Sequence, residues 1–201
     1  PTRRSSDLFW VFRKMFDGQP YREELLRRLD SIQRVLDASA SAAPMSIDRE
    51  LRGFIILLLF ASYENLITSL CRGLLETASS LRVSNRRMRR GFRQFAIHSH
   101  LKSIKGSISE GRIWKEAGPK LLDCAFNSRL CTIDSNLFPN DGSYMKSSQV
   151  CVFCDIFELG DPGPILREVW GSLDAIVTER NGIAHGRLTP EEVGRRYSHA
   201  D

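Results

Sequence analysis

Apolar residues recur at intervals of three and four positions along most of this 201-residue chain, which is the spacing of one face of an α-helix. The longest such pattern is predicted to begin at Ser46, which can cap a helix, and to fade around Ser79 and Ser80. Its apolar members include Leu57, Phe60, Ile67, Leu70 and Leu74. No strand-like alternation and no internal repeat stands out in the sequence. We therefore expect an all-α protein, roughly an up-and-down helical bundle.

Four further segments carry helical patterns. One follows Pro20, a second covers residues 145–159, and a third follows the turn residues at 160–164. A last short helix is predicted to start at a capping box, Thr189 to Glu192, and to end near Tyr197.

The middle of the chain is less regular. Residues 82–105 are basic and mixed, residues 106–119 are predicted to form a turn region around Trp114, and residues 130–142 contain a loop. We expect a bundle with an irregular, basic middle section. The predicted division is an N-terminal helical extension, residues 1–44, that packs on a main helical domain, residues 45–201.

Length and charge limit the class of protein. A chain of 201 residues can build one sizeable core, and its net charge of +5 suits a polyanionic partner. The chain starts at Pro1, so either an initiator methionine has been lost or the sequence is a fragment, and no apolar segment predicts a signal peptide. The most apolar run, residues 54–61, is too short to span a bilayer. It predicts a core helix and no membrane partner.

Five cysteines lie at irregular spacing, and an odd number argues against a secreted disulfide framework. The pattern favours reduced thiols and a cytoplasmic location. Cys151 and Cys154 form a lone C-x-x-C pair, and His98 and His100 could in principle complete a zinc site. Two buried thiols on a helix are the preferred interpretation, and we expect no metal and no cofactor.

The segment Arg180–Gly186 carries the chemistry of this chain. The apolar face of the preceding helix continues to Arg180, so a guanidinium lies where a core side chain is expected. It needs a carboxylate, backbone carbonyls or a bound phosphate as its partner. His185 lies about 140° around an ideal helix from Arg180. A fraying helix end at Gly186, or a second copy of the helix across a two-fold axis, could aim both side chains at one atom.

Together these side chains suit RNA cleavage by internal transesterification. An imidazole can take the proton of a ribose 2′-hydroxyl, and a guanidinium can hold the charged oxygens of the pentacovalent phosphorus. No metal is needed for this reaction. The alternative is a helix end: Asn181 and Gly182 loosen the helix, Gly186 stops it, and His185 suits the negative end of the helix dipole.

The run Arg180–Gly186 resembles the R-x4-6-H signature of the HEPN superfamily, in the form with four residues between Arg180 and His185. The surroundings are similar to the RiboL-PSP-type branch, which is associated with RNA ligase and phosphatase genes. This likeness covers about residues 45–198. Besides the motif, it is carried by Phe60–Glu64, Asp134–Leu137 and Ile156–Gly160.

The resemblance implies a helical bundle that dimerises and cleaves RNA without a metal, as a toxin or a defence or RNA-repair ribonuclease. Arg180 and His185 would be the catalytic pair of a composite site at a homodimer interface, and Asn181 would support their geometry. The resemblance is also compatible with two protein partners. One is an antitoxin, and the other is a nucleotidyltransferase that would modify Tyr197. Because some HEPN domains do not cleave RNA, a non-catalytic helical module that binds RNA or protein is the alternative.

Two other features are candidate parts of the site. Glu64 lies in line with Phe60 and Ile67 on a mostly apolar helix face, where its carboxylate could pair with Arg180 or simply reach solvent. The basic segment suits contacts with RNA phosphates, with Phe92 stacking on an unpaired base, or else forms a solvated face. Its candidate RNA-binding residues are Arg86, Arg87, Arg89, Arg90 and Arg93.

Overall fold

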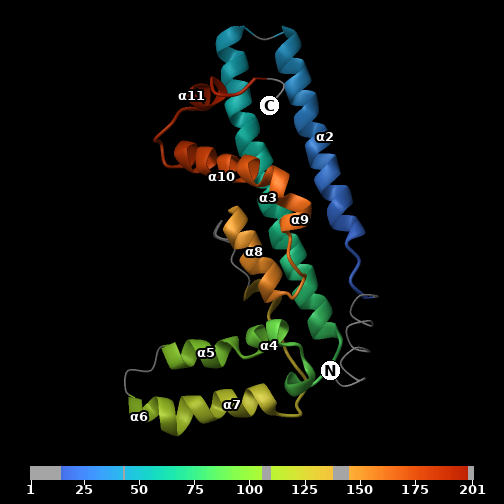
Figure 1. Ribbon diagram of the computed structural model, residues 1–201, viewed down its shortest axis with the longest axis vertical. Coiled ribbons are helices and arrows are strands. Elements are labelled where there is room, and N and C mark those ends of the chain that lie inside the picture. The colour runs from blue at the N-terminus through green and yellow to red at the C-terminus, as the bar shows by residue number, and fades with distance from the viewer. Residues whose placement is uncertain (1–14, 43, 106–109, 138–144, 199–201) are drawn as a thin grey trace. The chain divides into compact units, whose positions relative to one another are not determined.

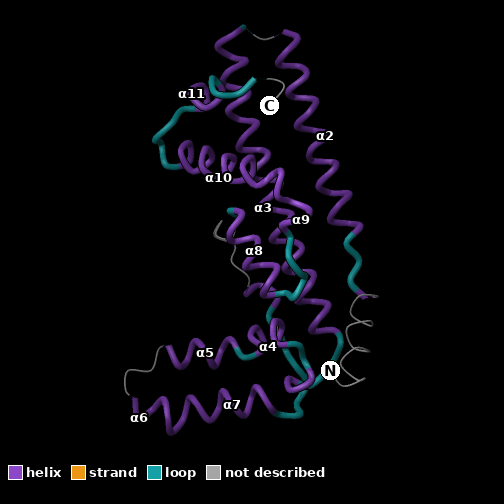
Figure 2. The backbone as a smooth tube through the Cα atoms, in the orientation of Figure 1, coloured by secondary structure: helices purple, strands orange, loops and turns teal. Residues whose placement is uncertain are grey.

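The computed structural model describes residues 15–42, 44–105, 110–137 and 145–198. Helices and loops account for these ranges, and the described residues form no strand; Ser84 and Leu130 make an isolated bridge (Figure 2). The predicted all-α class is therefore confirmed.

The long helices are α2 (Gln19–Ala42), α3 (Met45–Ser80) and α10 (Trp170–Ala184) (Figure 1). The shorter α-helices are α4 (Arg90–Ala96), α5 (His98–Lys105), α6 (Glu110–Arg112), α7 (Gly118–Phe126), α8 (Ser147–Ile156), α9 (Gly163–Leu166) and α11 (Pro190–Gly194). Single turns of other helix types are η1 (Asn85–Arg87), η2 (Ile113–Ala117), η3 (Ser135–Leu137) and η4 (Arg167–Val169).

The chain forms two compact units. The described residues within 18–70, 145–154 and 161–198 make up the first, which we call the hairpin unit. Those within 15–17, 71–137 and 155–160 make up the second, the basic unit. The predicted domain boundary at residue 44 stays a prediction, although the residues on both sides of it lie in the hairpin unit.

In the hairpin unit, α2 and the first part of α3 run antiparallel, and α10 crosses α3 (Figure 1). Ser39 near the end of α2 donates a hydrogen bond of 2.6 Å to Asp48 in the first turns of α3. The core is apolar because each of these helices turns one face inward. Its buried side chains include Ile55, Ile56, Phe60, Ile67, Val177 and Val193.

The C-terminal helix α11 confirms the predicted capping box. The Thr189 side chain accepts from the Glu192 amide, and the Glu192 carboxylate accepts from the Thr189 amide at 2.7 Å. The helix ends at Gly194, which is earlier than the predicted end near Tyr197.

In the basic unit, an aromatic cluster holds α4 against the segment that follows α8. The rings of Phe92 and Phe95 each lie 5.5 Å from the Phe157 ring, measured between centroids. The Arg89 side chain forms an ion pair of 2.9 Å with Glu158, next to this cluster. These contacts between distant residues stabilise the basic segment, residues 82–105, whose sequence alone shows no regular helical pattern.

The predicted turn region at 106–119 is wrong for the residues described. Residues 110–126 form a continuous helical stretch, α6, a π-helical turn η2 and α7, while residues 106–109 lie outside the described ranges. Gly118 and Pro119 are the first residues of α7 and directly follow the π-helical turn η2.

The apolar part of α3 is longer than the run of residues 54–61 that the sequence analysis judged too short to span a bilayer. Residues 47–80 form one helix that is long and apolar enough to cross a membrane, with a mean hydropathy of 1.8 in its most apolar window. The core helix of a soluble protein passes the same test, and 33% of that window is buried.

Candidate active site and basic surface

Arg180 lies on α10 with its guanidinium packed on α3. Its Cζ atom lies 4.3 Å from the centroid of the Phe60 ring, and its Nη1 donates a hydrogen bond of 2.9 Å to Asn181 Oδ1. A cation over an aromatic face is stabilised by the ring quadrupole. This aromatic partner was not among those that the sequence predicted for a guanidinium on the core face.

The structure brings Asn181 to Arg180, as the supporting role requires, but it does not bring Glu64 there. Glu64 is half-buried on α3, one turn beyond Phe60, and no ion pair joins it to Arg180 among the described residues. The predicted pairing of Glu64 with Arg180 is not made within one chain. The face of the guanidinium that meets α3 is covered by the Phe60 ring instead.

His185 is the exposed last residue of this element, the C-cap of α10. Its amide donates to Asn181 O at 3.1 Å, and Gly186 then adopts a left-handed φ of +67°, a conformation that favours glycine. The predicted helix stop is confirmed. No hydrogen bond joins the side chains of His185 and Arg180 in the described part of one chain.

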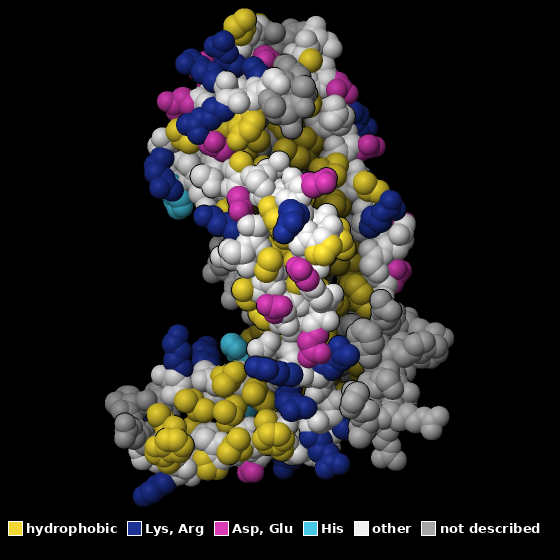
Figure 3. Space-filling view, viewed as in Figure 1, with side chains coloured by type: hydrophobic (Ala, Val, Ile, Leu, Met, Phe, Trp, Pro, Cys, Tyr) yellow, Lys and Arg dark blue, Asp and Glu magenta, His cyan; other side chains and the backbone are white. Residues whose placement is uncertain are grey.

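The five arginines of the basic segment divide into two groups. Arg86, Arg87 and Arg90 are exposed, so their guanidiniums can meet a polyanion, and Figure 3 shows Lys and Arg side chains on the surface of the basic unit. Arg89 is paired with Glu158. Arg93 folds back on its own segment and donates to three carbonyl oxygens, those of Asn85, Arg86 and Met88.

Two sequence predictions for this surface therefore need correction. Arg93 holds η1 in place and is not free for RNA, since its guanidinium donates to three backbone carbonyls of its own segment. Phe92 is only 5% exposed and meets Phe157 edge to face, so it cannot stack on a base. His98 is exposed and stays a candidate contact.

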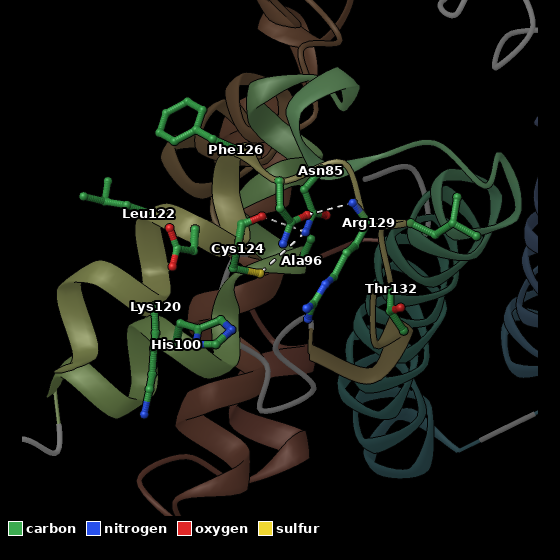
Figure 4. Close-up of a pocket in the computed structure, with 12 residues that line it drawn as sticks. Asn85, Ala96, His100, Lys120, Leu122, Cys124, Phe126, Arg129 and Thr132 are labelled. Carbon is green, nitrogen blue, oxygen red and sulfur yellow. Dashed lines mark hydrogen bonds between the residues drawn. The ribbon is translucent and has the colours of Figure 1, made fainter.

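The sequence did not predict a pocket of 810 Å³ in the basic unit, between α5, α7 and the segment after α7. In Figure 4, His100 and Lys120 lie below Cys124, Arg129 lies to its right, and Leu122 and Phe126 lie to its upper left. At the floor, Asn85 Nδ2 donates to the Cys124 carbonyl at 2.9 Å. The pocket was missed because its lining comes from two stretches that are separated in the sequence, residues 85–100 and 120–132, and only the packed structure brings them together.

All five cysteines are free. Burial raises the pKa of the Cys71 thiol and raises that of Cys131 to about 11, so both stay protonated at neutral pH. Cys151 is half-buried and Cys154 is buried on α8. In the described ranges, no three His, Cys, Asp or Glu side chains gather as metal ligands, so the zinc alternative lacks a ligand set there.

Tyr197, the candidate acceptor of a modifying enzyme, is half-buried, and its carbonyl oxygen accepts a hydrogen bond from Arg52. No family model, curated protein or solved structure matches this chain. The HEPN resemblance therefore depends on the sequence runs named above, of which Arg180–Gly186 is the most specific.

Proposed function

We propose that this chain is an endoribonuclease that cleaves RNA by 2′-hydroxyl transesterification and acts as a homodimer. One observation carries the proposal: Arg180 is held by Phe60 and Asn181 one turn before an exposed His185 at the helix end. A fixed cation and an accessible imidazole are the two groups that the reaction needs. A role as a toxin or a defence or RNA-repair ribonuclease fits such an activity.

In the proposed reaction, the His185 imidazole accepts the proton of the 2′-hydroxyl as its oxygen bonds to the adjacent phosphorus. The bond from phosphorus to the 5′-oxygen then breaks, and an imidazolium returns a proton to that leaving oxygen. The products are a 2′,3′-cyclic phosphate and a 5′-hydroxyl. Arg180 stabilises the pentacovalent species with the guanidinium nitrogens that Asn181 does not engage.

A second copy completes the site in this proposal. In one chain, Arg180 packs against α3 whereas His185 faces solvent, and no contact links the two side chains among the residues described. A two-fold axis beside the end of α10 would place two arginines and two histidines around one phosphodiester. One imidazole could then act as base while the other acts as acid.

The test is cleavage of single-stranded RNA by the full chain in the presence of EDTA, with end-group analysis of the products. Arg180→Ala and His185→Ala should each lower the rate at least a hundredfold, the usual contribution of such groups. Arg187→Ala, an exposed cation two residues beyond His185, is the matched control and should keep full activity. Full cleavage by either of the first two variants would exclude the proposed pair.

The alternative is a non-catalytic helical module that binds RNA or a protein partner. It is favoured by the engagement of Arg180 with Phe60 and Asn181, which satisfies the guanidinium without any substrate. Salt-sensitive RNA binding with no product between about pH 5 and pH 9, a range that brackets histidine titration, would support this module over the nuclease.

A further inference from the structure

A second cavity, in the hairpin unit, has a different chemistry from the RNA site. It measures 790 Å³ and lies between α2, α3, α10 and the segment that follows α11. This volume falls within the range of cavities that hold small organic molecules, about 300–1,000 Å³. Figure 3 shows hydrophobic atoms gathered between these elements near the C-terminal end of the described chain.

Much of the wall of this cavity is aliphatic, although Gln33, Ser172 and Ser198 also line it. Branched side chains from three helices line it, among them Ile32, Leu36, Ile55, Leu59 and Ile176. Tyr197 is the one aromatic residue among the described lining residues. Such a wall favours a flexible alkyl chain, because it offers extensive dispersion contact and few ring faces on which a base could stack.

Two arginines, Arg52 and Arg196, give the same cavity a polar end. Arg52 is 15% exposed; its Nη2 forms an ion pair of 3.0 Å with Asp48, and its Nη1 donates to the Tyr197 carbonyl. Its Nε is buried without a hydrogen-bond partner. A buried donor left unpaired costs about 1–3 kcal/mol, and more on a charged group, so an acceptor oxygen brought to this atom would stabilise the protein.

Arg196 adds a second set of donors. Its Nη1 is shared between the two carboxylate oxygens of Glu179, at 2.8 Å and 3.0 Å, and its other guanidinium nitrogens make no hydrogen bond to the residues that the structure describes. Half of the side chain is exposed, and Arg196 lines the cavity while it keeps its ion pair with Glu179. Guanidinium groups suit carboxylates because their donors match the two oxygens in one plane.

We propose that this cavity binds a fatty acid, with the alkyl chain along the aliphatic wall and the carboxylate at Arg52 and Arg196. The inference is independent of the ribonuclease proposal, because neither Arg180 nor His185 lines the cavity. The same ligand could reach the cavity from two sources: as a free fatty acid in solution or as a fatty acid taken up from a membrane surface.

Binding is tested on the full chain with laurate below its micelle concentration, by thermal shift and by displacement of a fluorescent fatty acid. Laurate should raise the unfolding temperature, and the cationic dodecyltrimethylammonium should not. A response to both amphiphiles alike, or to neither, overturns the proposal. If the protein co-sediments with phosphatidylcholine vesicles loaded with laurate and then takes up the laurate, the source is a membrane. If it binds the vesicles but does not respond to free laurate, the fatty-acid site is overturned.

Two variants separate the site from general stability. Arg52→Gln should weaken laurate binding about tenfold or more, the loss expected for one charged hydrogen bond. Because this variant also loses the Asp48 pair, Ile176→Phe provides a second test: it places a bulkier side chain in the cavity wall, keeps the core apolar and should weaken binding. The matched controls are Arg22→Gln and Leu58→Phe, exposed positions on α2 and α3 outside the lining. Unchanged affinity in both test variants would overturn the assignment.

Discussion

Gly53 and Gly194 let the backbones of α3 and α11 touch. A Cβ atom added to Gly53 would lie 1.9 Å from the Pro190 carbonyl oxygen, and one added to Gly194 would lie 1.8 Å from the Arg49 carbonyl oxygen. Both obstacles are backbone atoms and cannot rotate away. The two helices therefore need glycine at both positions to keep their present spacing.

Gly53→Ala should lower the free energy of unfolding by about 2 kcal/mol or more, since α11 must move to admit the methyl group. Gly171→Ala is the matched control, because a Cβ there meets nothing within 4 Å. Alanine in that helix should leave stability unchanged or raise it by up to about 1 kcal/mol. Urea unfolding of the three proteins measures the difference, and equal effects of the two substitutions would contradict the proposed contact.

At the scale of whole elements, α8 depends on α10 for its N-terminal cap. The Asp174 carboxylate on α10 accepts from the Ser147 amide and from the Ser147 hydroxyl, each at 2.7 Å. These two hydrogen bonds lower the pKa of Asp174 below its ordinary value of 3.8. The cap therefore joins two helices and is charge-dependent.

Asp174→Asn should cost about 1 kcal/mol of stability at pH 7. Because the folded-state pKa is depressed, the carboxylate's contribution is present above pH 3.8 and is lost as the pH falls through the lower, folded value. The stability difference between the native chain and the variant should therefore shrink in acid. Denaturant unfolding from pH 7 to about pH 2.5 measures it, with the exposed Asp30→Asn on α2 as the control; a pH-independent difference would argue against the charged cap.

At the scale of the whole molecule, the chain has a net charge of +5. We expect this charge to contribute to RNA binding only through basic side chains that are exposed and not engaged with other groups of the protein. Replacing Arg86, Arg87 and Arg90 together by alanine should weaken single-stranded RNA binding. The slope of log affinity against log salt should fall by about 2, given roughly 0.7 for each phosphate contact. Arg93→Ala should instead destabilise the basic unit, because it removes donors from three carbonyls.

Salt-dependent binding measurements on the triple variant test this prediction. The matched control carries alanine at three exposed arginines of the hairpin unit, Arg22, Arg34 and Arg167. It has the same change in net charge. If both triple variants weaken RNA binding equally, overall charge and not the basic segment governs the interaction.

The sequence by itself determined the features that neighbouring residues encode. Helical spacing predicted α2, α3 and α10, the Thr189 capping box predicted the start of α11, and Gly186 marked the end of α10. These features depend on hydrogen bonds within one turn and on the period of apolar residues, so a local pattern is sufficient. The motif Arg180–His185 was likewise visible in the sequence, together with its position at a helix end.

Only the tertiary structure decided which side chain meets which. It placed Phe60 under Arg180, left Glu64 unpaired with it, buried Phe92 against Phe157 and turned Arg93 onto its own backbone. Phe60 and Phe157 lie on elements distant in the sequence from the side chains that they meet, whereas the carbonyls that accept from Arg93 lie in its own segment. Burial depends on how all the elements pack together. The spacing of apolar residues predicts which face of a helix is buried, but not which residues of other elements that face contacts.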